Sequence, residues 1–348
     1  GYYTRIVDAD SSNALSYLKR AQYHQYLDNT EQLVADMDKY VSIVNPRTDL
    51  NSHDHWFRDM LVALWKSKPR NLGPPVNTPG HDAGPVSPDG LSLFLASNQS
   101  GTYGHLDGWV ATRPSAFGPW SAPENLGAPI NTEYYEGPPV VEDDNLSIYF
   151  TSIRPGGFGE GDIWFSTRET TNTPWDPPRN LGPTINSTSG EAVSCISSDG
   201  LELYISSDRP GPDGNRHWDI WVSKRITKQD DWSAPVNLGP PINSPDFDGI
   251  AAPSPDGLTM FFTSDRPGGC GNRDIWVTTR STRESSWREP VNLGPPINTL
   301  DWDQGAIISV VDSMLYFNSW RPGGLGLLDM YKVPIPRLSD NYISGSRD

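Results

Sequence analysis

Five carboxylates recur at one position of a sequence repeat, and they are the first candidates for chemistry. Each follows an asparagine of the repeat by five residues, and the five are Asp82, Glu136, Glu191, Asp248 and Asp303. Several carboxylate and carbonyl oxygens around one point are the ligands that Ca²⁺ takes in proteins. One prediction is therefore a calcium ion held by these acids at the centre of the molecule. The alternative is structural, because a carboxylate that binds backbone amides or an arginine suits a position repeated in every unit.

Other candidates lie where the repeated units differ from one another. The residue just before the carboxylate is aromatic or histidine in four of the five units, and nearby loops add further rings and a cation. The predicted ligand-binding residues are His81, His105, Tyr134, Tyr135, Arg216, His217, Trp218, Phe247 and Trp302. Flat rings beside carboxylates suit the C–H faces and hydroxyls of a sugar, and they also suit a peptide or a protein surface. Ordinary packing of aromatic side chains under loops is the alternative.

An enzyme acting on polysaccharide is the alternative function. A lyase needs a base and a charge neutraliser, for which His81, His105, His217 and Arg216 are candidates. A glycoside hydrolase needs two carboxylates at a suitable separation, and five near-equivalent acids give no reason to choose a pair. No nucleophile motif, phosphate-binding loop or strong metal motif interrupts the repeat. We therefore assign no catalytic residue and favour a binding or interaction protein for a glycan, a protein or a cation, which can also be a subunit of a larger assembly.

The elements that must position these residues follow from the repeat itself. The string Asn-Leu-Gly begins at Asn71, Asn125, Asn180, Asn237 and Asn292, at intervals of 54, 55, 57 and 55 residues. Each unit holds a turn such as Asp199-Gly200, whose residues supply the positive φ angles of a tight hairpin. An alternating strand, a Ser-x-Arg-Pro-Gly loop, a strand that opens with Asp and a strand led by Trp complete the unit. We expect the loop arginine and the opening Asp to pair across the loop.

Four short strands per unit cannot bury both of their faces alone, so the sheets must pack against one another around an axis. The predicted fold is all-β: a five-bladed β-propeller over residues 65–340. The predicted blades are 78–131, 132–186, 187–243, 244–298, and 299–335 completed by 65–77. The N-terminal strand becomes the outer strand of the last blade, which closes the ring and hides an exposed edge. We call the face at which the first strand of each blade begins the top, and the face with the Asp-Gly turns the bottom.

These residues resemble the WD40-like, TolB-type propeller repeat of bacterial periplasmic, envelope and secreted proteins. The resemblance is carried by Ser-Pro-Asp-Gly at 87–90 and 254–257, Ser-Asp-Arg-Pro-Gly at 207–211 and 264–268, and Asp-Ile-Trp at 162–164, 219–221 and 274–276. It covers roughly residues 65–335. It departs at Gln99, which replaces the loop arginine, and at Val311-Asp312, which replaces the Asp-Gly turn. The resemblance implies a fold and an extracytoplasmic setting, and it implies no single activity.

The segment before the ring, residues 1–64, lacks the repeat and is expected to be helical. Helices are predicted after Ser11-Ser12-Asn13, from Asn29 to Asn45-Pro46, and over residues 52–65. We expect them to pack on the propeller, and a separate domain or a docking element for a partner subunit are the alternatives. The sequence His53-Asp54-His55 is expected to be a solvated helix start, with a pair of metal ligands as the alternative. Residues 341–348 are expected to form a tail.

The overall charge limits the partners. The net charge is −16 over 348 residues, a field that repels nucleic acid and anionic lipid, so neither is an expected partner. The sequence contains no run of eighteen apolar residues, so we expect no transmembrane segment. The two cysteines, Cys195 and Cys270, are expected on opposite faces and unpaired, with Cys195 a small buried residue. The sequence starts at Gly1 without Met, and we expect a periplasmic, cell-surface or secreted protein that has lost a leader.

Overall fold

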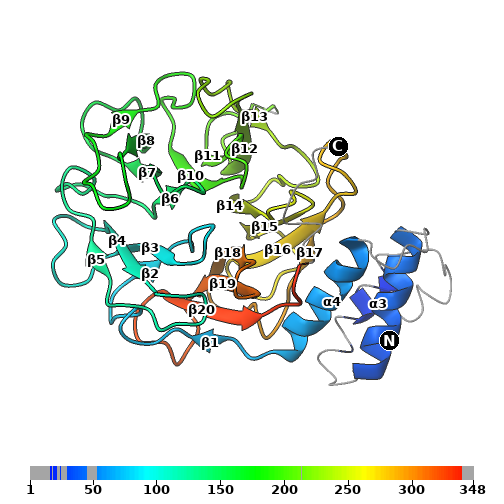
Figure 1. Cartoon of the computed structure of the whole chain (residues 1–348). Helices are drawn as coiled ribbons and strands as arrows, with labels where there is room; N and C mark the ends of the chain where they lie inside the picture. Colours follow the sequence, from blue (N-terminus) through cyan, green and yellow to red (C-terminus); the bar gives the residue numbers. More distant parts are fainter. Residues whose placement is uncertain are drawn as a thin grey trace.

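Five four-stranded antiparallel sheets form a ring in the computed structural model, and helices lie against one side of it (Figure 1). The structure describes residues 16, 17, 19–21, 24, 30–44, 53–212 and 214–338. The predicted first helix start, the stretch 45–52 that includes Asn45-Pro46, and the tail 341–348 lie outside these residues. Blades 1 to 4 follow chain order from the inner to the outer strand, and the fifth has β1 as its outer strand, so the five-bladed prediction is confirmed.

The blades consist of strands of two to seven residues. Blade 1 contains β2 (Asp82–Ala83), β3 (Ser92–Ser97), β4 (Asp107–Thr112) and β5 (Glu124–Asn125). Blade 2 contains β6 (Val140–Val141), β7 (Ser147–Ser152), β8 (Asp162–Thr167) and β9 (Arg179–Asn180). Blade 3 contains β10 (Glu191–Ile196), β11 (Glu202–Ser207), β12 (Asp219–Lys224) and β13 (Val236–Asn237). Blade 4 contains β14 (Asp248–Pro253), β15 (Thr259–Ser264), β16 (Asp274–Thr279) and β17 (Val291–Asn292).

The last blade joins the two ends of the described chain. Blade 5 contains β18 (Asp303–Ser309), β19 (Met314–Ser319), β20 (Asp329–Pro334) and, as its outer strand, β1 (Arg70–Asn71). Strand β1 pairs antiparallel with β20, with Arg70 opposite Lys332 and Asn71 opposite Tyr331. The predicted closure by the N-terminal strand is therefore confirmed.

The bottom hairpins form where the sequence places Asp-Gly or Asp-Asn. Gly200 has a φ of 72° and Asn145 a φ of 56°, values that residues other than Gly, Asn and Asp rarely adopt. Blade 5 makes the same turn without glycine, since Ser313 takes a φ of 54°. The turn chemistry of the repeat therefore fixes which strands pair and in which register.

At the top, backbone hydrogen bonds connect each blade to the next. The amide at the start of every innermost strand donates to a carbonyl just before the third strand of the preceding blade. The five bonds run from Glu136 to Leu106, Glu191 to Gly161, Asp248 to Trp218, Asp303 to Arg273 and Asp82 to Leu328. The last of these crosses from blade 5 to blade 1, so the ring is continuous at the top as well as in its outer strand.

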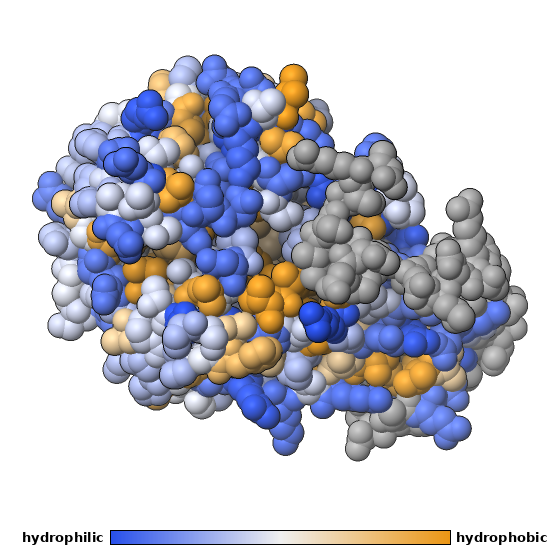
Figure 2. Space-filling model, in the orientation of Figure 1, coloured by the Kyte–Doolittle hydropathy of each residue, from blue (hydrophilic) through white to orange (hydrophobic). Residues whose placement is uncertain are grey.

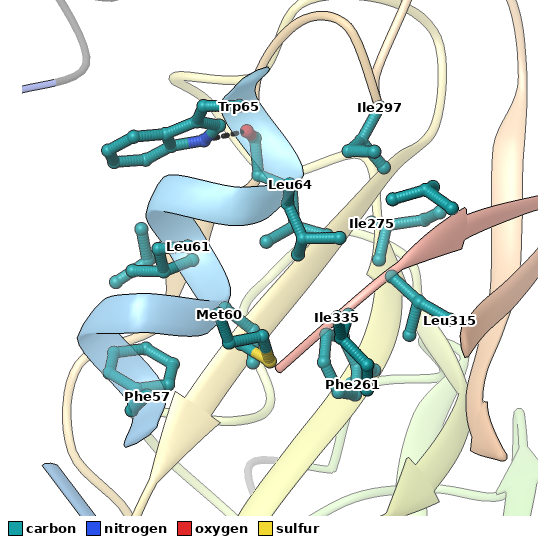
Figure 3. Packing of buried hydrophobic residues seen from close by; sticks show 14 of the residues in the cluster. Phe57, Met60, Leu61, Leu64, Trp65, Phe261, Ile275, Ile297, Leu315 and Ile335 are labelled. Carbon is teal, nitrogen blue, oxygen red and sulfur yellow. Dashed lines mark hydrogen bonds between the residues drawn. The ribbon is translucent and has the colours of Figure 1, made fainter. Parts of the chain in front are cut away.

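Two helices in the N-terminal segment cover the junction of blades 4 and 5. They are α3 (Thr30–Val44) and α4 (His53–Lys66), close to the predicted ranges. Met60 and Leu64 of α4 point towards side chains of blades 4 and 5, and Trp65 donates a hydrogen bond to the Leu293 carbonyl at 2.6 Å (Figure 3). The helices bury residues that are exposed in other blades. Val236 of blade 3 is 63% exposed, whereas Val291, at the same position of blade 4, is 2% exposed.

The start of α4 is not solvated as predicted. His53 is largely buried, with Nδ1 3.2 Å from a carboxylate oxygen of Asp256 and Nε2 2.7 Å from the Thr259 hydroxyl. Asp54 is buried and accepts a hydrogen bond from Arg288 of blade 4. These contacts dock the helix on blade 4, and the sequence did not reveal them because both partners lie about 200 residues away. No helix in the described part of the chain is long and apolar enough to cross a bilayer.

Candidate ligand-binding site at the top of the channel

The five recurring carboxylates are buried inside their blades. In blade 2, Glu136 is fully buried and accepts hydrogen bonds from the backbone amide and hydroxyl of Thr132, at 2.9 and 2.6 Å. The Ser152 hydroxyl and the Arg154 guanidinium donate to the same carboxylate at 3.0 and 3.1 Å. Arg154 also donates to the carbonyls of Pro129 and Ile130, which end the preceding blade. We call this arrangement of carboxylate, hydroxyls and arginine the blade clamp.

The blade clamp recurs around the ring. The arginine–carboxylate distances are 3.0 Å for Arg209–Glu191, 2.6 Å for Arg266–Asp248 and 2.9 Å for Arg321–Asp303. In blade 1 the arginine is replaced by Gln99, and Asp82 keeps only its bonds to Thr78 and Ser97. Both oxygens of every one of these carboxylates accept a hydrogen bond. The calcium prediction stays a prediction, and it requires these oxygens to give up those bonds.

The loop arginine therefore has a different partner from the one predicted. We expected it to pair with the Asp that opens the third strand, but it pairs with the carboxylate of the first strand. The opening Asp instead accepts hydrogen bonds from the top loop and from the asparagine of Asn-Leu-Gly. Asp162, for example, accepts from the Phe158 amide at 2.6 Å and from the Asn180 side chain at 2.8 Å. Two separate networks thus satisfy the recurring polar residues at the top of each blade.

A cavity of about 260 Å³ lies at the top of the central channel, and we call it the upper cavity. Apolar side chains and backbone of the five innermost strands form most of its wall. The five recurring carboxylates all lie in the described part of the chain, and none of them lines this cavity. The five acids predicted to gather at the centre of the molecule are therefore not part of this wall, because their carboxylates turn into their own blades. In Figure 2 apolar residues also gather towards the centre of the ring, while its rim is mostly hydrophilic.

Three polar side chains from three blades face the upper cavity without a described hydrogen-bond partner. They are the His81 imidazole, the Tyr135 hydroxyl and the Gln304 amide. Burial lowers the pKa of His81, an effect that the charge of Asp82 only partly offsets, so the ring is neutral near pH 7. Burial also raises the pKa of Tyr135, which keeps its proton. The cavity thus presents neutral donors and acceptors.

An aromatic row runs along the rim beside the upper cavity, across blades 3 to 5. Trp218 and Phe247 have ring centroids 6.4 Å apart, and Trp302 and Trp320 stack at 4.8 Å with an interplanar angle of 14°. The Arg273 guanidinium joins the two pairs, because its carbon lies 3.7 Å from the Phe247 centroid and 4.5 Å from that of Trp302. We call these five residues the aromatic row.

The structure places the other predicted ligand residues away from this centre. His105 is exposed and His217 is half-buried, and neither lines the upper cavity, so the three histidines do not form one group. Arg216 is exposed and paired with Asp208 at 2.8 Å. Tyr134 is half-buried in the link before blade 2 and does not line the cavity. Of the predicted residues, His81 and Tyr135 line the upper cavity, and Trp218, Phe247 and Trp302 form part of the aromatic row outside its wall.

Three residues of the site were not predicted: Arg273, Gln304 and Trp320. A signal for each was present in the repeat. Gln304 occupies a position at which the other blades have Ala83, Gly137, Ala192 and Gly249. Arg273 aligns with Leu106, Gly161, Trp218 and Leu328, and Trp320 with Asn98, Ile153, Asp208 and Asp265. In each case one blade has a large or charged residue where the equivalent positions of the other blades have residues of other types. A departure of this kind is a sequence signal for a site.

The bottom of the channel holds a smaller cavity of about 70 Å³, which Cys195 helps to line. Cys195 is buried as predicted, and burial raises the pKa of its thiol to about 12. It makes no disulfide with Cys270. An unreactive thiol and small apolar residues therefore form this end, and we place the candidate site at the top.

No protein-family model matches the sequence, and no curated protein matches it. Solved structures are similar in fold. A TolB-type protein from Agrobacterium tumefaciens shares 17% identity over 70% of each chain, with a TM-score of 0.43. An α-L-arabinofuranosidase from Lactobacillus brevis shares 12% identity over 77% of this chain and 94% of its own, with a TM-score of 0.48. An exo-β-1,3-galactanase from Phanerochaete chrysosporium shares 13% identity over 76% and 62%, with a TM-score of 0.49.

The chain is a five-bladed β-propeller. This assignment rests on the five sheets of the chain itself and on the repeat, since the neighbours are similar only at the level of the fold. A likeness at this level assigns no function to this chain.

Proposed function

We propose that this propeller binds a carbohydrate at the top of its channel, as a binding module without chemistry of its own. The observation that carries the proposal is the convergence of the His81, Tyr135 and Gln304 side chains, none of which is hydrogen-bonded within the described chain, on one mostly apolar cavity. A concave apolar site with a few convergent polar groups is the usual form of a small-molecule site. The volume of about 260 Å³ is just below the range of roughly 300–1,000 Å³ for drug-sized ligands, so it suits a single sugar ring.

The aromatic row provides the surface on which further sugar units can lie. Trp302 is half-buried, with Trp320 stacked on its ring and the Arg273 guanidinium over it at 4.5 Å. Trp320 is 41% exposed, so it offers the accessible aromatic face of the row. An aromatic face packs against the C–H groups of a sugar ring while the hydroxyls stay in water, which suits a surface that is partly exposed. A ligand with one ring in the upper cavity and the next on the row would use both features.

Binding assays on matched variants test the proposal. Titration of a panel of neutral and acidic oligosaccharides, followed by calorimetry, is expected to find at least one ligand. Gln304→Leu and Trp302→Ala are each expected to weaken its binding by roughly tenfold, about 1.4 kcal/mol. Tyr103→Ala removes a ring that is 61% exposed on the same face but does not line the cavity, and it should leave binding unchanged. A panel without any ligand would refute the proposal.

A second candidate function is β-elimination on an acidic polysaccharide. It is favoured by one observation: His81, whose lowered pKa leaves a neutral imidazole that can accept a proton, shares the cavity with the Tyr135 hydroxyl. Incubation with uronate polysaccharides, read at 235 nm, would show the unsaturated product, and His81→Ala would abolish it. The hydrolase alternative has no comparable support, because both oxygens of every recurring carboxylate are already hydrogen-bonded.

Three expectations from the sequence stay predictions. They are a calcium ion at the recurring carboxylates, a partner subunit bound through residues 1–64, and a periplasmic, cell-surface or secreted setting. Part of the apolar surface of α3 and α4 is buried against blades 4 and 5, so a partner subunit would contact their outer sides. Thermal melting with and without calcium, and co-purification with and without residues 1–52, would examine the first two.

A further inference from the structure

Arg273 is the only charged residue of the aromatic row, and its setting is unusual for a structural arginine. Its guanidinium lies between the rings of Phe247 and Trp302, which come from two different blades. The loop arginines also lie over aromatic rings, but each of them in addition makes an ion pair with a buried carboxylate, as Arg266 does with Asp248. Arg273 has the rings without the carboxylate.

The hydrogen-bonding capacity of Arg273 is unused within the described chain. Its guanidinium donates no hydrogen bond to another described residue and forms no ion pair there. The nearby acid, Asp265, acts on it only at longer range, and one oxygen of that carboxylate accepts the Phe247 amide at 2.7 Å. A guanidinium held by its two faces keeps its five N–H donors in the plane between them, where they can reach a ligand.

We propose that the carbohydrate ligand is acidic and that Arg273 binds its carboxylate, so that the ligand class is a sugar acid such as a hexuronate. This inference rests on the proposed function and specifies its ligand. A planar carboxylate accepts two parallel hydrogen bonds from one guanidinium, and this match distinguishes it from a hydroxyl or an amide. The rings on both sides fix the guanidinium before the ligand arrives, so little conformational entropy is lost on binding.

The net charge of the whole molecule further restricts which acidic ligands are expected to bind. The net charge of −16 repels a polyanion at long range, and one cation on the rim cannot offset that field. At physiological ionic strength the screening length is about 8 Å, so an isolated carboxylate beside Arg273 is affected mainly by that residue. The ligand is therefore an oligosaccharide with a single acidic sugar rather than a polyuronate or a sulfated chain.

Calorimetry with a matched pair of ligands tests the inference. The probes are an aldobiuronic acid, which joins one hexuronate to one neutral sugar, and its carboxyl-reduced counterpart. We expect the acid to bind the wild-type protein roughly 10- to 100-fold more tightly, the range for hydrogen bonds to a charged group. Arg273→Gln should bring both probes to the affinity of the neutral one. Arg216→Gln, an exposed arginine of the same face that is already paired, should change neither affinity.

The outcomes separate this inference from the proposed function. Equal binding of both probes by the wild-type protein, or an acid preference that survives Arg273→Gln, would refute the carboxylate site and leave the carbohydrate site standing. No binding of either probe, with neutral glycans of the wider panel also silent, would refute both. Should Arg273→Gln melt at a lower temperature than the wild type, Arg273→Lys serves in its place, because it keeps the charge but loses the planar fork. Its acid preference is expected to fall at least severalfold.

Discussion

The two faces of the ring use the same residue types in opposite ways. At the top, arginine and carboxylate pair within one blade, as Arg266 and Asp248 do at 2.6 Å. At the bottom they pair between blades: Arg113 of blade 1 holds Asp312 of blade 5 at 3.0 Å, and Arg225 of blade 3 holds a buried glutamate of blade 2. The top pairs are copies of one another. At the bottom Arg113 and Arg225 occupy the same repeat position, but the acids that they bind do not.

What the bottom pairs share is their place in the ring, while the residue types of the partners differ. The acid near each bottom turn is held by a residue of the next blade or, in blade 4, by His53 of α4. The remaining contacts are Asn145 to Asp89, Arg283 to Asp199 and His53 to Asp256. Departures from the repeat at the bottom are therefore structural, while those at the top lie on an open rim. A departure indicates a ligand site only where its side chain is also accessible and without a partner.

Among the variants that test this difference between the two faces, the largest loss of stability is expected where blades 1 and 5 meet. Asp312 is buried and accepts hydrogen bonds from Arg113 at 3.0 Å and from the Tyr316 hydroxyl at 2.6 Å. Asp312→Ala leaves a buried guanidinium without its charge partner, which typically costs 3–5 kcal/mol. Urea unfolding is expected to show a loss of about that size.

Two controls accompany this experiment. Replacing both charges, with Arg113→Met and Asp312→Leu, should recover a large part of the loss, because no buried charge is left unpaired. Arg216→Gln breaks an exposed pair and should change stability by less than about 1 kcal/mol. A loss for Asp312→Ala no greater than that of Arg216→Gln would show that the bottom pairs do not hold the ring.

The blade clamp at the top should be worth less, because its arginine is partly exposed and Asp248 keeps its hydrogen bonds from Ser244 when the arginine is lost. Arg266→Gln removes hydrogen bonds to Asp248 and to the carbonyls of Pro241 and Ile242. We expect a loss of roughly 1.5–3 kcal/mol in urea unfolding, the range for a hydrogen bond to a charged group. Arg216→Gln is again the matched control. Equal losses for Arg266→Gln and Asp312→Ala would remove the distinction between the two faces.

The contact of α4 with blade 4 should give a smaller effect that depends on pH. Burial raises the pKa of Asp256, but the hydrogen bond and charge of His53, with bonds from Ser254 and Leu258, outweigh it and hold that pKa below its usual value. Since the folded-state pKa is lowered, the stabilisation is complete above the unfolded value near 3.9 and is lost as pH falls through the folded value.

Denaturation of Asp256→Asn across pH 2–6 measures this contribution. The wild type should be more stable by roughly 1–2 kcal/mol at pH 5–6, and the difference should shrink steadily below about pH 4. Asp231→Asn changes an exposed carboxylate without a described contact and should show no such dependence. A difference that is constant down to pH 2 would contradict the ionic role of Asp256.

The smallest expected effect is a gain in stability. In blade 1 the clamp arginine is replaced by Gln99, whose amide nitrogen is buried without a hydrogen-bond partner among the described residues. Gln99→Arg can restore the bond to Asp82 and should stabilise the protein by about 0.5–1.5 kcal/mol in thermal and urea unfolding. A loss of stability would show that blade 1 has no room for the arginine and that its glutamine serves another purpose.

The fold could be predicted from the sequence because it depends on local chemistry repeated five times. Turn residues such as Asp199-Gly200 specify each hairpin, and the offset of Asn-Leu-Gly by one unit specifies the closing strand. The contacts of α4 could not be predicted in this way. The pairing of His53 with Asp256 joins residues about 200 positions apart, and no repeat signals it.

The candidate site was predicted in part, and the missed part has a physical reason. Phe247 and Trp302 drew attention because they precede a recurring carboxylate, and they are at the site. Arg273 was overlooked because its importance depends on two rings from different blades, which only the radial packing brings to 3.7 and 4.5 Å. The carboxylates were overrated as ligands for the opposite reason, since the sequence does not show that each has donors within its own blade.

The pairing of β1 with β20 also sets an order for folding during synthesis. Asn71 leaves the ribosome about 260 residues before its partner Tyr331, so the outer strand of the last blade is made first and paired last. Until then, the part of α4 that Leu315 and Ile335 of blade 5 will cover stays open to solvent or to a chaperone, although blade 4 already contacts the helix. Blades 1 to 4 can form in sequence, but the ring cannot close on a nascent chain that lacks its last blade. A ribosome stalled before residue 329 would therefore present an open propeller whose α4 is covered by blade 4 alone, and this intermediate should be more sensitive to proteases than the closed ring.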